Sequence, residues 1–483
     1  MEHSERAAAA SATAAPTVID RRAVRLRVLA LAGPVIGQNI LETMLGIVDT
    51  ALVARLGASA TAGVGAALQV MFFVIAALSA LSIGSAVLVA QAYGARDTER
   101  ASRLARQSIV WSILIGTPLA LLGGLFAEPI ISIFGVAPDV ARIATDYLQV
   151  TMGTMVVLVA LFIGGGVLRG AGDSRTPMIV TGIANVVNIG LTYALIYGVA
   201  GFPALGAVGS AWGSFLARLL ALGLMLVALW RGRDGVSIRG ISGWRPDLTV
   251  ARQILKLGIP AAIEQILTSA AFFTLVIIVA RLGTVTLAAH QITFTALSAS
   301  FLPGFGFAIA TTTLVGQSIG ARRIAEGDAA TKVAVLWAVG WMTVIATLLF
   351  IFAEGALGLF TNDAQVIATG AAAMRVVALG QPFWAILFVF PGALRGAGNT
   401  RFPLVAGSGS IWLTVGIAAI LLHFGGGLPS VWAAFLATSP FVAALYWWRW
   451  RRLVREIELR EREGQREPRY TATEEPVRET AAL

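Results

Sequence analysis

The sequence predicts an all-α integral membrane protein in which twelve transmembrane helices form two six-helix lobes related by a pseudo-twofold axis along the membrane normal. Three observations support this fold class. Of the 483 residues, 57% are hydrophobic and only 13% are charged, whereas a soluble domain carries about 25% charge. Apolar runs long enough to cross about 30 Å of hydrocarbon as helices recur along nearly the whole chain. The second half of the chain also repeats the first.

The apolar runs define the expected elements in order. We expect spans at residues 28–53, 62–90, 105–127, 141–165, 177–199, 204–230, 254–279, 287–315, 331–352, 367–392, 403–423 and 428–448. The first run follows Arg21 and Arg22 and so resembles an export signal. It is too long for a signal core and contains two acids, so we expect a retained helix.

These spans divide the chain into five parts. We expect a disordered cytoplasmic tail, an N-lobe of helices 1–6, a cytoplasmic inter-lobe connection, a C-lobe of helices 7–12 and a charged, solvated cytoplasmic tail, at residues 1–27, 28–230, 231–253, 254–448 and 449–483. The segment YWWRWRR at Tyr446–Arg452 combines aromatic and basic residues, as interfacial anchors do.

The net charge of +10 reports topology rather than nucleic-acid binding. All but five of the 36 lysine and arginine residues lie in the two tails, in the even-numbered connections or within three residues of those connections; the exceptions are Arg55, Arg142, Arg218, Arg281 and Arg375. Positive charge gathers on the cytoplasmic side of membrane proteins. We therefore expect both termini in the cytoplasm and the protein in the cell inner (plasma) membrane.

An internal repeat runs through the chain at an offset of 226 residues. LRGAGDSRTP at Leu168 recurs as LRGAGNTRFP at Leu394, LVAQAYGAR at Leu88 recurs as LVGQSIGAR at Leu314, and Pro34 matches Pro260. Six spans return the chain to its starting side, so both lobes enter the membrane in the same orientation. Such parallel repeats build the two halves of some secondary transporters.

The LRGAG segments themselves predict tight cytoplasmic turns. Arg169 and Arg395 stand where a cation favours a helix C-terminus, and the glycines permit the left-handed conformations that end helices. The arginines also help to set topology. A phosphate-binding role is not favoured.

Several reaction classes are excluded by residue content. The chain has no cysteine, which excludes disulfides and thiolate chemistry. Its lysines, Lys256 and Lys332, follow Leu255 and Thr331, so no phosphate-binding loop for ATP exists. We expect no metal and no cofactor apart from a transported ion, which leaves an ion gradient as the energy source.

Three acids lie within the expected spans and are the candidate cation-coupling residues. Glu42 and Asp49 are seven residues apart on one face of the first helix, and Glu264 lies in the seventh. Ionisable groups inside a membrane are costly and call for a reason. Burial disfavours the ionised form of a carboxylate, which suits a group that loads and releases protons.

The two lobes differ at these positions. Glu264 matches Gln38 in the repeat, Asp49 matches Leu275 and Glu42 matches Thr268. Residues that serve only packing would be expected in both lobes, so a difference between the lobes at these positions indicates function.

A supporting polar network and a hinge complete the candidate site. The candidate hinge is Pro34, which removes a backbone donor and is expected to kink the first helix; a static bend without a hinge role is the alternative. The network candidates are Gln38, Asn185, Asn188, Thr192, Ser214 and His290. Interhelical hydrogen bonding without a coupling role is the alternative for the asparagines, and a satisfied interfacial histidine is the alternative for His290.

The chain resembles the multidrug and toxin extrusion (MATE) family of prokaryotic type, over residues 28–450. The resemblance rests on PVIGQN and VDTALVARLG in the first helix, on LAAHQI and PGFGFAIATTTLVGQSIGA across the eighth and ninth helices, and on LRGAGxxRxP in each half. It implies two lobes about a central cleft. It also implies export of amphipathic, often cationic compounds by alternating access, in exchange for protons or sodium ions.

Within that resemblance, Asp49 matches the family's coupling aspartate, Pro34 its bending proline and Glu264 its seventh-helix glutamate. Thr192 stands where proton-coupled members carry a second aspartate. Trp384 stands where sodium-coupled members often carry an acid. A sodium site needs several oxygen ligands and a proton needs one titratable group, so we favour proton coupling through Asp49.

Two other functions are weighed. A lipid-linked sugar flippase of the same superfamily would need a more cationic cleft than the acidic residues above provide. An integral-membrane transferase would show clustered His or Asp motifs, whereas the three histidines are scattered. We therefore expect a monomeric, non-enzymatic multidrug antiporter for xenobiotic export, with small amphipathic or cationic substrates and membrane lipid as its partners and no nucleic acid.

Overall fold

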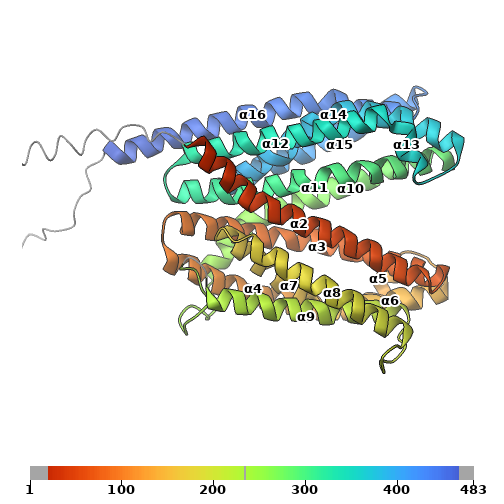
Figure 1. Cartoon of the computed structure of the whole chain (residues 1–483), viewed down its shortest axis with the longest axis horizontal. Helices are drawn as coiled ribbons and strands as arrows, with labels where there is room; N and C mark the ends of the chain where they lie inside the picture. Colours follow the sequence, from red (N-terminus) through yellow and green to blue (C-terminus); the bar gives the residue numbers. More distant parts are fainter. Residues whose placement is uncertain (1–19, 233–234, 467–483) are drawn as a thin grey trace, which may run out of the picture.

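The computed structural model describes residues 20–232 and 235–466, and every regular element in these ranges is a helix. Two bundles lie one above the other in Figure 1. The first contains α2 (Arg21–Ala54), α3 (Ala58–Gly94), α4 (Thr98–Leu125), α5 (Ala127–Ser132), α6 (Pro138–Gly153), α7 (Met155–Gly170), α8 (Arg175–Tyr197) and α9 (Ala207–Arg231). The second contains α10 (Leu248–Ala280), α11 (Thr284–Gly320), α12 (Ile324–Ile351), α13 (Ala353–Gly358), α14 (Ala364–Gly396), α15 (Arg401–His423) and α16 (Leu428–Arg466).

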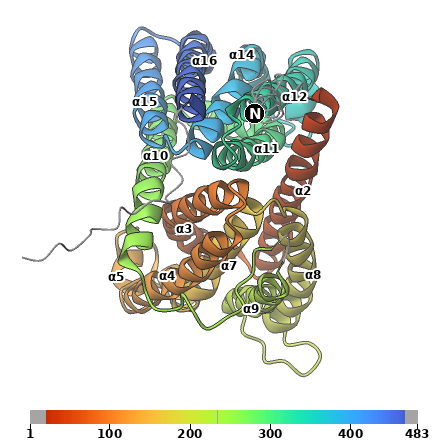
Figure 2. The same cartoon turned by 90° about the vertical axis from the view of Figure 1, so that its left-hand side faces the viewer.

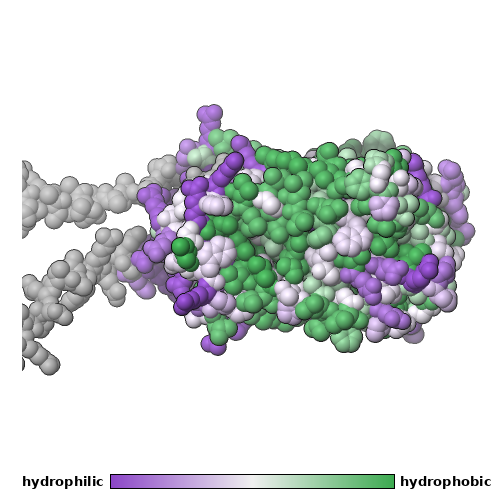
Figure 3. Space-filling model, turned by 90° about the horizontal axis from the view of Figure 1, so that it is seen from below, coloured by the Kyte–Doolittle hydropathy of each residue, from purple (hydrophilic) through white to green (hydrophobic). Residues whose placement is uncertain are grey.

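The twelve expected spans are confirmed. In the described ranges, 11 helices are long and apolar enough to cross a membrane, and the bent pair α6 and α7 supplies the twelfth. A broad hydrophobic band covers the middle of the molecule, with hydrophilic residues toward both ends (Figure 3). We call the side on which α2 begins and α16 ends the terminal side, and the opposite side the far side.

The fourth span is broken, which its apolar composition did not predict. The run expected at 141–165 forms α6 and α7, which meet at Thr154 with a 51° bend. The Thr154 hydroxyl donates to the carbonyls of Val150 at 2.8 Å and Thr151 at 3.2 Å. Hydroxyl groups that bond back to the preceding turn bend helices, and Gly153 beside it weakens the helix further.

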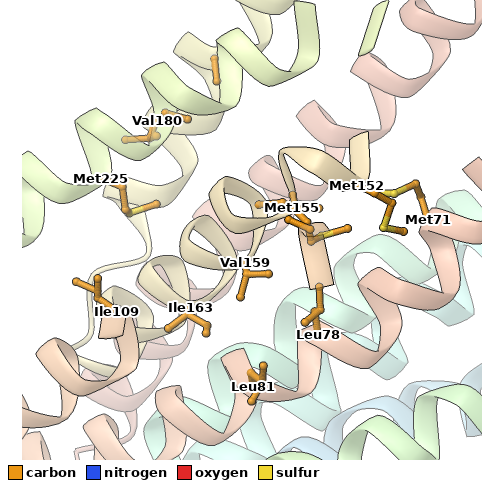
Figure 4. Close-up of a cluster of buried hydrophobic side chains, with 14 of the residues drawn as sticks. Met71, Leu78, Leu81, Ile109, Met152, Met155, Val159, Ile163, Val180 and Met225 are labelled. Carbon is orange, nitrogen blue, oxygen red and sulfur yellow. The ribbon is translucent and has the colours of Figure 1, made fainter. Parts of the chain in front are cut away.

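Small and medium apolar side chains fill the core of the first lobe. Figure 4 shows Met71 and Leu78 of α3 with Met155, Val159 and Ile163 of α7 in one buried cluster. Glycines allow close backbone approach here: a Cβ at Gly166 would lie 2.8 Å from the carbonyl oxygen of Ser82. Close packing of small residues is the main source of helix association in lipid.

The first helix of each lobe crosses to the other lobe. Val24 and Val28, near the start of α2, belong to the hydrophobic core of the second lobe. Val250 and Ile254, near the start of α10, belong to the core of the first. Val28 and Ile254 are equivalent in the repeat (28 and 254 differ by 226). Figure 2 shows α2 and α10 extending across the boundary on opposite sides of the molecule.

The expected N-terminal tail is shorter than predicted. Residues 21–27 are helical, and residues 1–19 lie outside the described ranges. Asp20 caps α2, because its carboxylate accepts from the backbone of Arg22 at 2.8 Å. The burial of Val24 against the second lobe then holds this first turn in place.

The solvated tail expected from residue 449 instead continues α16 as a helix up to Arg466, and the start of this extension is partly buried. Tyr446, Trp450 and Val454 share one helical face and are buried. The Trp450 indole donates to Asp328 at 2.9 Å. Among the aromatic side chains of this segment, only Trp447 and Trp448 are exposed as those of an interfacial anchor would be. Residues 467–483 lie outside the described ranges.

We expect Trp450→Ala to destabilise the second lobe by about 3–5 kcal/mol, because it removes a fully buried aromatic side chain. The measurement is thermal unfolding in detergent. Trp448→Ala, at a position 49% exposed, is the matched control. Equal transition temperatures for the two variants would show that the α16 extension does not dock in solution.

The inter-lobe connection is attached to α4. Gln107 donates to the carbonyls of Gly243 and Arg245, each at 2.6 Å, and Arg103 forms an ion pair with Asp247 at 2.6 Å. Ser102 accepts from the backbone of Ser237 at 3.1 Å. Ser102 is the repeat equivalent of Asp328, so in each lobe the segment after the sixth span binds the third.

Candidate functional site

The polar site of the first lobe lies in the far-side half, among α2, α6, α8 and α9. Asp49 of α2 is partly buried, and its Oδ1 atom is buried with no hydrogen-bond partner among the described residues. Arg218 of α9 and Tyr147 of α6 are close enough to interact with this carboxylate electrostatically. Asp49 therefore has a nearby cation and one oxygen that the protein does not bond.

Three of the predicted polar residues form one hydrogen-bonded chain between α8 and α9. Thr192 donates to the Asn188 side-chain oxygen at 3.1 Å, and Asn188 donates to the Ser214 hydroxyl at 3.0 Å. All three are buried. Asn185 instead donates to the backbone carbonyl of Leu41 at 2.7 Å, so it fastens α8 to α2 eight residues before Asp49.

Tyr147 and Ser210 belong to this site, and sequence reasoning missed them. The Tyr147 hydroxyl interacts with Ser210, Arg218 and Asp49. A tyrosine is uncharged and can lie in an apolar span at little energetic cost, so the sequence does not mark Tyr147 as a site residue. Only its position on the buried face of α6 identifies it. Arg218, the one arginine within the sixth expected span, also lies near Asp49.

Gln38 and Glu42 form a second polar group on α2. Gln38 donates to Glu42 at 2.9 Å, and the Arg169 guanidinium lies 3.5 Å from the Gln38 side-chain oxygen. Glu42 is exposed in the structure. It lies two helical turns from Asp49, toward the terminal side.

Glu264 is paired with Arg395. The two side chains are 2.7 Å apart and only 11% and 22% exposed. Glu264 and Arg395 are the repeat equivalents of Gln38 and Arg169, so the same contact occurs in both lobes but carries a carboxylate only in the second. The LRGAG arginines thus point into the lobes and bind the first helix of each, which their expected role in topology did not include.

The two remaining candidates lie apart from the Asp49 site. His290 is buried in the second lobe, where its ring stacks on Trp432 at 5.4 Å. Pro34 lies inside α2, which is one continuous helix from Arg21 to Ala54.

Two repeated six-span lobes, with a partly buried carboxylate in one and an ion-paired carboxylate in the other, define a secondary membrane transporter. The sequence profile of the MatE family matches residues 34–194 and 260–424, one stretch in each lobe. The chain belongs to the MATE family.

Relatives agree with this assignment, and a solved structure shares the fold. A probable multidrug resistance protein NorM of Thermotoga maritima is 32% identical over 425 residues, which is 87% of this chain and 91% of that protein. The uncharacterized transporter YisQ of Bacillus subtilis is 26% identical over 87% of this chain and 93% of its own length. The outward-facing structure of a multidrug resistance MATE transporter of the MOP superfamily shares the fold, with a TM-score of 0.84, 23% identity and coverage of 90% of this chain and 97% of that one.

Proposed function

We propose that the protein exports amphipathic, often cationic small molecules in exchange for protons, by alternating access of its two lobes. Asp49 is the residue that loads and releases the coupling proton. The observation that carries this proposal is the buried Oδ1 of Asp49, which has no hydrogen-bond partner in the described residues. A buried carboxylate oxygen without a partner is costly, and protonation or an incoming cation relieves that cost.

The ion pair of the second lobe supports Asp49 over Glu264 as the coupling residue. Each acid has one buried carboxylate oxygen without a hydrogen-bond partner among the described residues, but that oxygen of Glu264 lies 2.7 Å from the Arg395 guanidinium, which neutralises it. A proton bound at Asp49 therefore displaces no strong contact. Glu264 in this proposal holds α10 to α14.

The local chemistry around Asp49 favours a proton over sodium. Thr192, where a second carboxylate would assist a metal ion, instead donates to Asn188. Trp384, at the expected acid position of α14, is buried and donates to Ser439 at 2.9 Å. A proton needs only the one acid.

The arginine distribution orients the transporter. The terminal side carries the tails and the even-numbered connections, so we place it in the cytoplasm and the protein, acting as a monomer, in the plasma membrane. Cargo is then released on the far side. Apart from the exchanged ion, no cofactor takes part.

Transport of a cationic dye by purified protein in liposomes tests the proposed coupling. We expect a proton gradient imposed alone to drive dye movement at least about tenfold above protein-free liposomes, and a sodium gradient imposed alone to leave it near that background. Each gradient is clamped at the same membrane potential, so that the dye's own charge does not drive it. Movement driven by sodium and not by protons would refute proton coupling.

A further inference from the structure

On the terminal side, two glutamines that are equivalent in the repeat form hydrogen bonds between the two lobes. Gln91 of α3 donates to the carbonyl of Gly396 at 3.2 Å, and Gln317 of α11 donates to the carbonyl of Gly170 at 3.0 Å. Gln91 and Gln317 are 226 residues apart, and so are Gly170 and Gly396. Each bond therefore runs from one lobe to the LRGAG segment of the other, and the pseudo-twofold axis relates the two bonds.

Two further glycines bring α3 and α11 together at the same place. A Cβ on Gly94 would overlap the backbone carbonyl of Gln317, and a Cβ on Gly320 would overlap that of Gln91. For Gly94 the three nearest atoms all belong to the opposite lobe. Gly94 and Gly320 are themselves repeat equivalents, so this close approach is duplicated as well.

We propose that these four residues and the two LRGAG carbonyls form a gate, which we call the amide clasp, and that the clasp must open for the terminal side to admit cargo. This inference rests on the alternating access proposed above. In the described ranges, every side-chain hydrogen bond between residues of the two halves of the chain lies on the terminal side. The hydrogen bonds between the lobes therefore hold the structure shut on the terminal side.

The clasp is built to open reversibly. Both glutamines are partly buried, and Gln317 also lines a cavity of about 630 Å³ with Gly94 and Gly172 on the terminal side. Water can reach the bonds and replace them when the lobes separate, so opening strands no buried polar group. The bonds are neutral and weak enough for the equilibrium to be shifted by cargo or a proton.

The clasp also explains why LRGAG is duplicated. Within each lobe, Gly170 and Gly396 pack tightly on the neighbouring helix: a Cβ at Gly170 would lie 2.6 Å from the carbonyl oxygen of Ala86, and one at Gly396 would overlap the carbonyl of Thr312. Ala86 and Thr312 are again equivalent. The glycines bring the end of α7 onto α3 and the end of α14 onto α11, where their carbonyls face the opposite lobe.

Distances between paired spin labels test the clasp. The chain has no cysteine, so two can be introduced on exposed sites of the opposite lobes: Arg100 with Arg401 on the terminal side, and Val199 with Phe424 on the far side. We expect Gln91→Ala combined with Gln317→Ala to raise the ratio of open to closed terminal sides by roughly tenfold, since two neutral hydrogen bonds are lost. The far-side distance should shorten in step.

A second variant should open the terminal side by steric repulsion and not by the loss of hydrogen bonds. Gly94→Ala keeps both hydrogen-bonding glutamines but inserts a methyl group between the lobes, so it should also open the terminal side while leaving each lobe folded. Gln365→Ala, at an exposed glutamine on the far side, is the control and should change neither distance.

The outcomes separate the gate from the transport mechanism. Unchanged terminal-side distances in both the glutamine variant and Gly94→Ala would overturn the clasp. Opening of the terminal side with no shortening on the far side would support the clasp and refute the alternating access on which the proposed function rests.

Discussion

Asp49→Asn is expected to reduce proton-driven dye transport in liposomes to the level of protein-free liposomes. Asparagine keeps the shape of the side chain but cannot take up or release a proton. The side chains that interact with Asp49, namely Arg218 and Tyr147, offer no carboxylate to replace it. Dye binding measured without a gradient should persist, because the loss lies in coupling.

The control for this variant is Asp139→Asn. Asp139 is an acid of the same lobe that accepts a hydrogen bond from Ser59 at 2.6 Å on the far side, away from the Asp49 group. The Asp139→Asn substitution also removes one negative charge, but it should leave transport unchanged. Both variants should unfold at temperatures close to that of the parent protein. Normal proton-driven transport by Asp49→Asn would rule out Asp49 as the coupling residue.

Breaking the ion pair of the second lobe should have a large effect on stability. Arg395→Gln leaves the Glu264 carboxylate buried without its cation, and removing one partner of a buried pair costs about 3–5 kcal/mol. Adding Glu264→Gln removes the stranded charge as well. We expect thermal unfolding to show a large loss in the single variant and recovery of most of it in the double variant.

The repeat supplies a matched control for this experiment. Arg169→Gln changes the equivalent arginine of the first lobe, whose partner at 3.5 Å is the neutral Gln38. It should therefore cost clearly less than Arg395→Gln. Equal losses would show that the carboxylate of Glu264 adds nothing.

Transport by the Glu264→Gln and Arg395→Gln double variant decides the role of Glu264. If Glu264 only holds α10 to α14, a folded neutral pair retains proton-driven transport. Loss of coupling in that folded variant would restore Glu264 as a coupling residue, as its difference from Gln38 first suggested.

Much of the fold follows from the order of residues alone. Hydrocarbon thickness sets the length of each span, so twelve apolar runs predict twelve helices. The 226-residue register predicts two parallel lobes. The acid at Asp49 and the polar residues Asn188, Thr192 and Ser214 are also identified, because polar groups in a membrane need partners.

The local sequence pattern does not predict contacts between segments that are far apart in the chain. The helical face of Tyr446, Trp450 and Val454 is present in the sequence, but its burial depends on α12 lying beside it. The break at Thr154 was likewise not predicted, because the apolar run continues through it without interruption. For the same reason Tyr147 enters the site only when α6 packs near α2.

The sequence by itself determined the number of spans and the internal duplication. It also determined that Asp49 of the first lobe has no equivalent acid in the second lobe. The tertiary structure decided what the repeated LRGAG segments do. Their arginines turn inward to Gln38 and Glu264, and their glycine carbonyls receive Gln317 and Gln91 from the opposite lobe. A repeat shows that two positions are equivalent, but only packing two lobes against each other shows which equivalent positions meet.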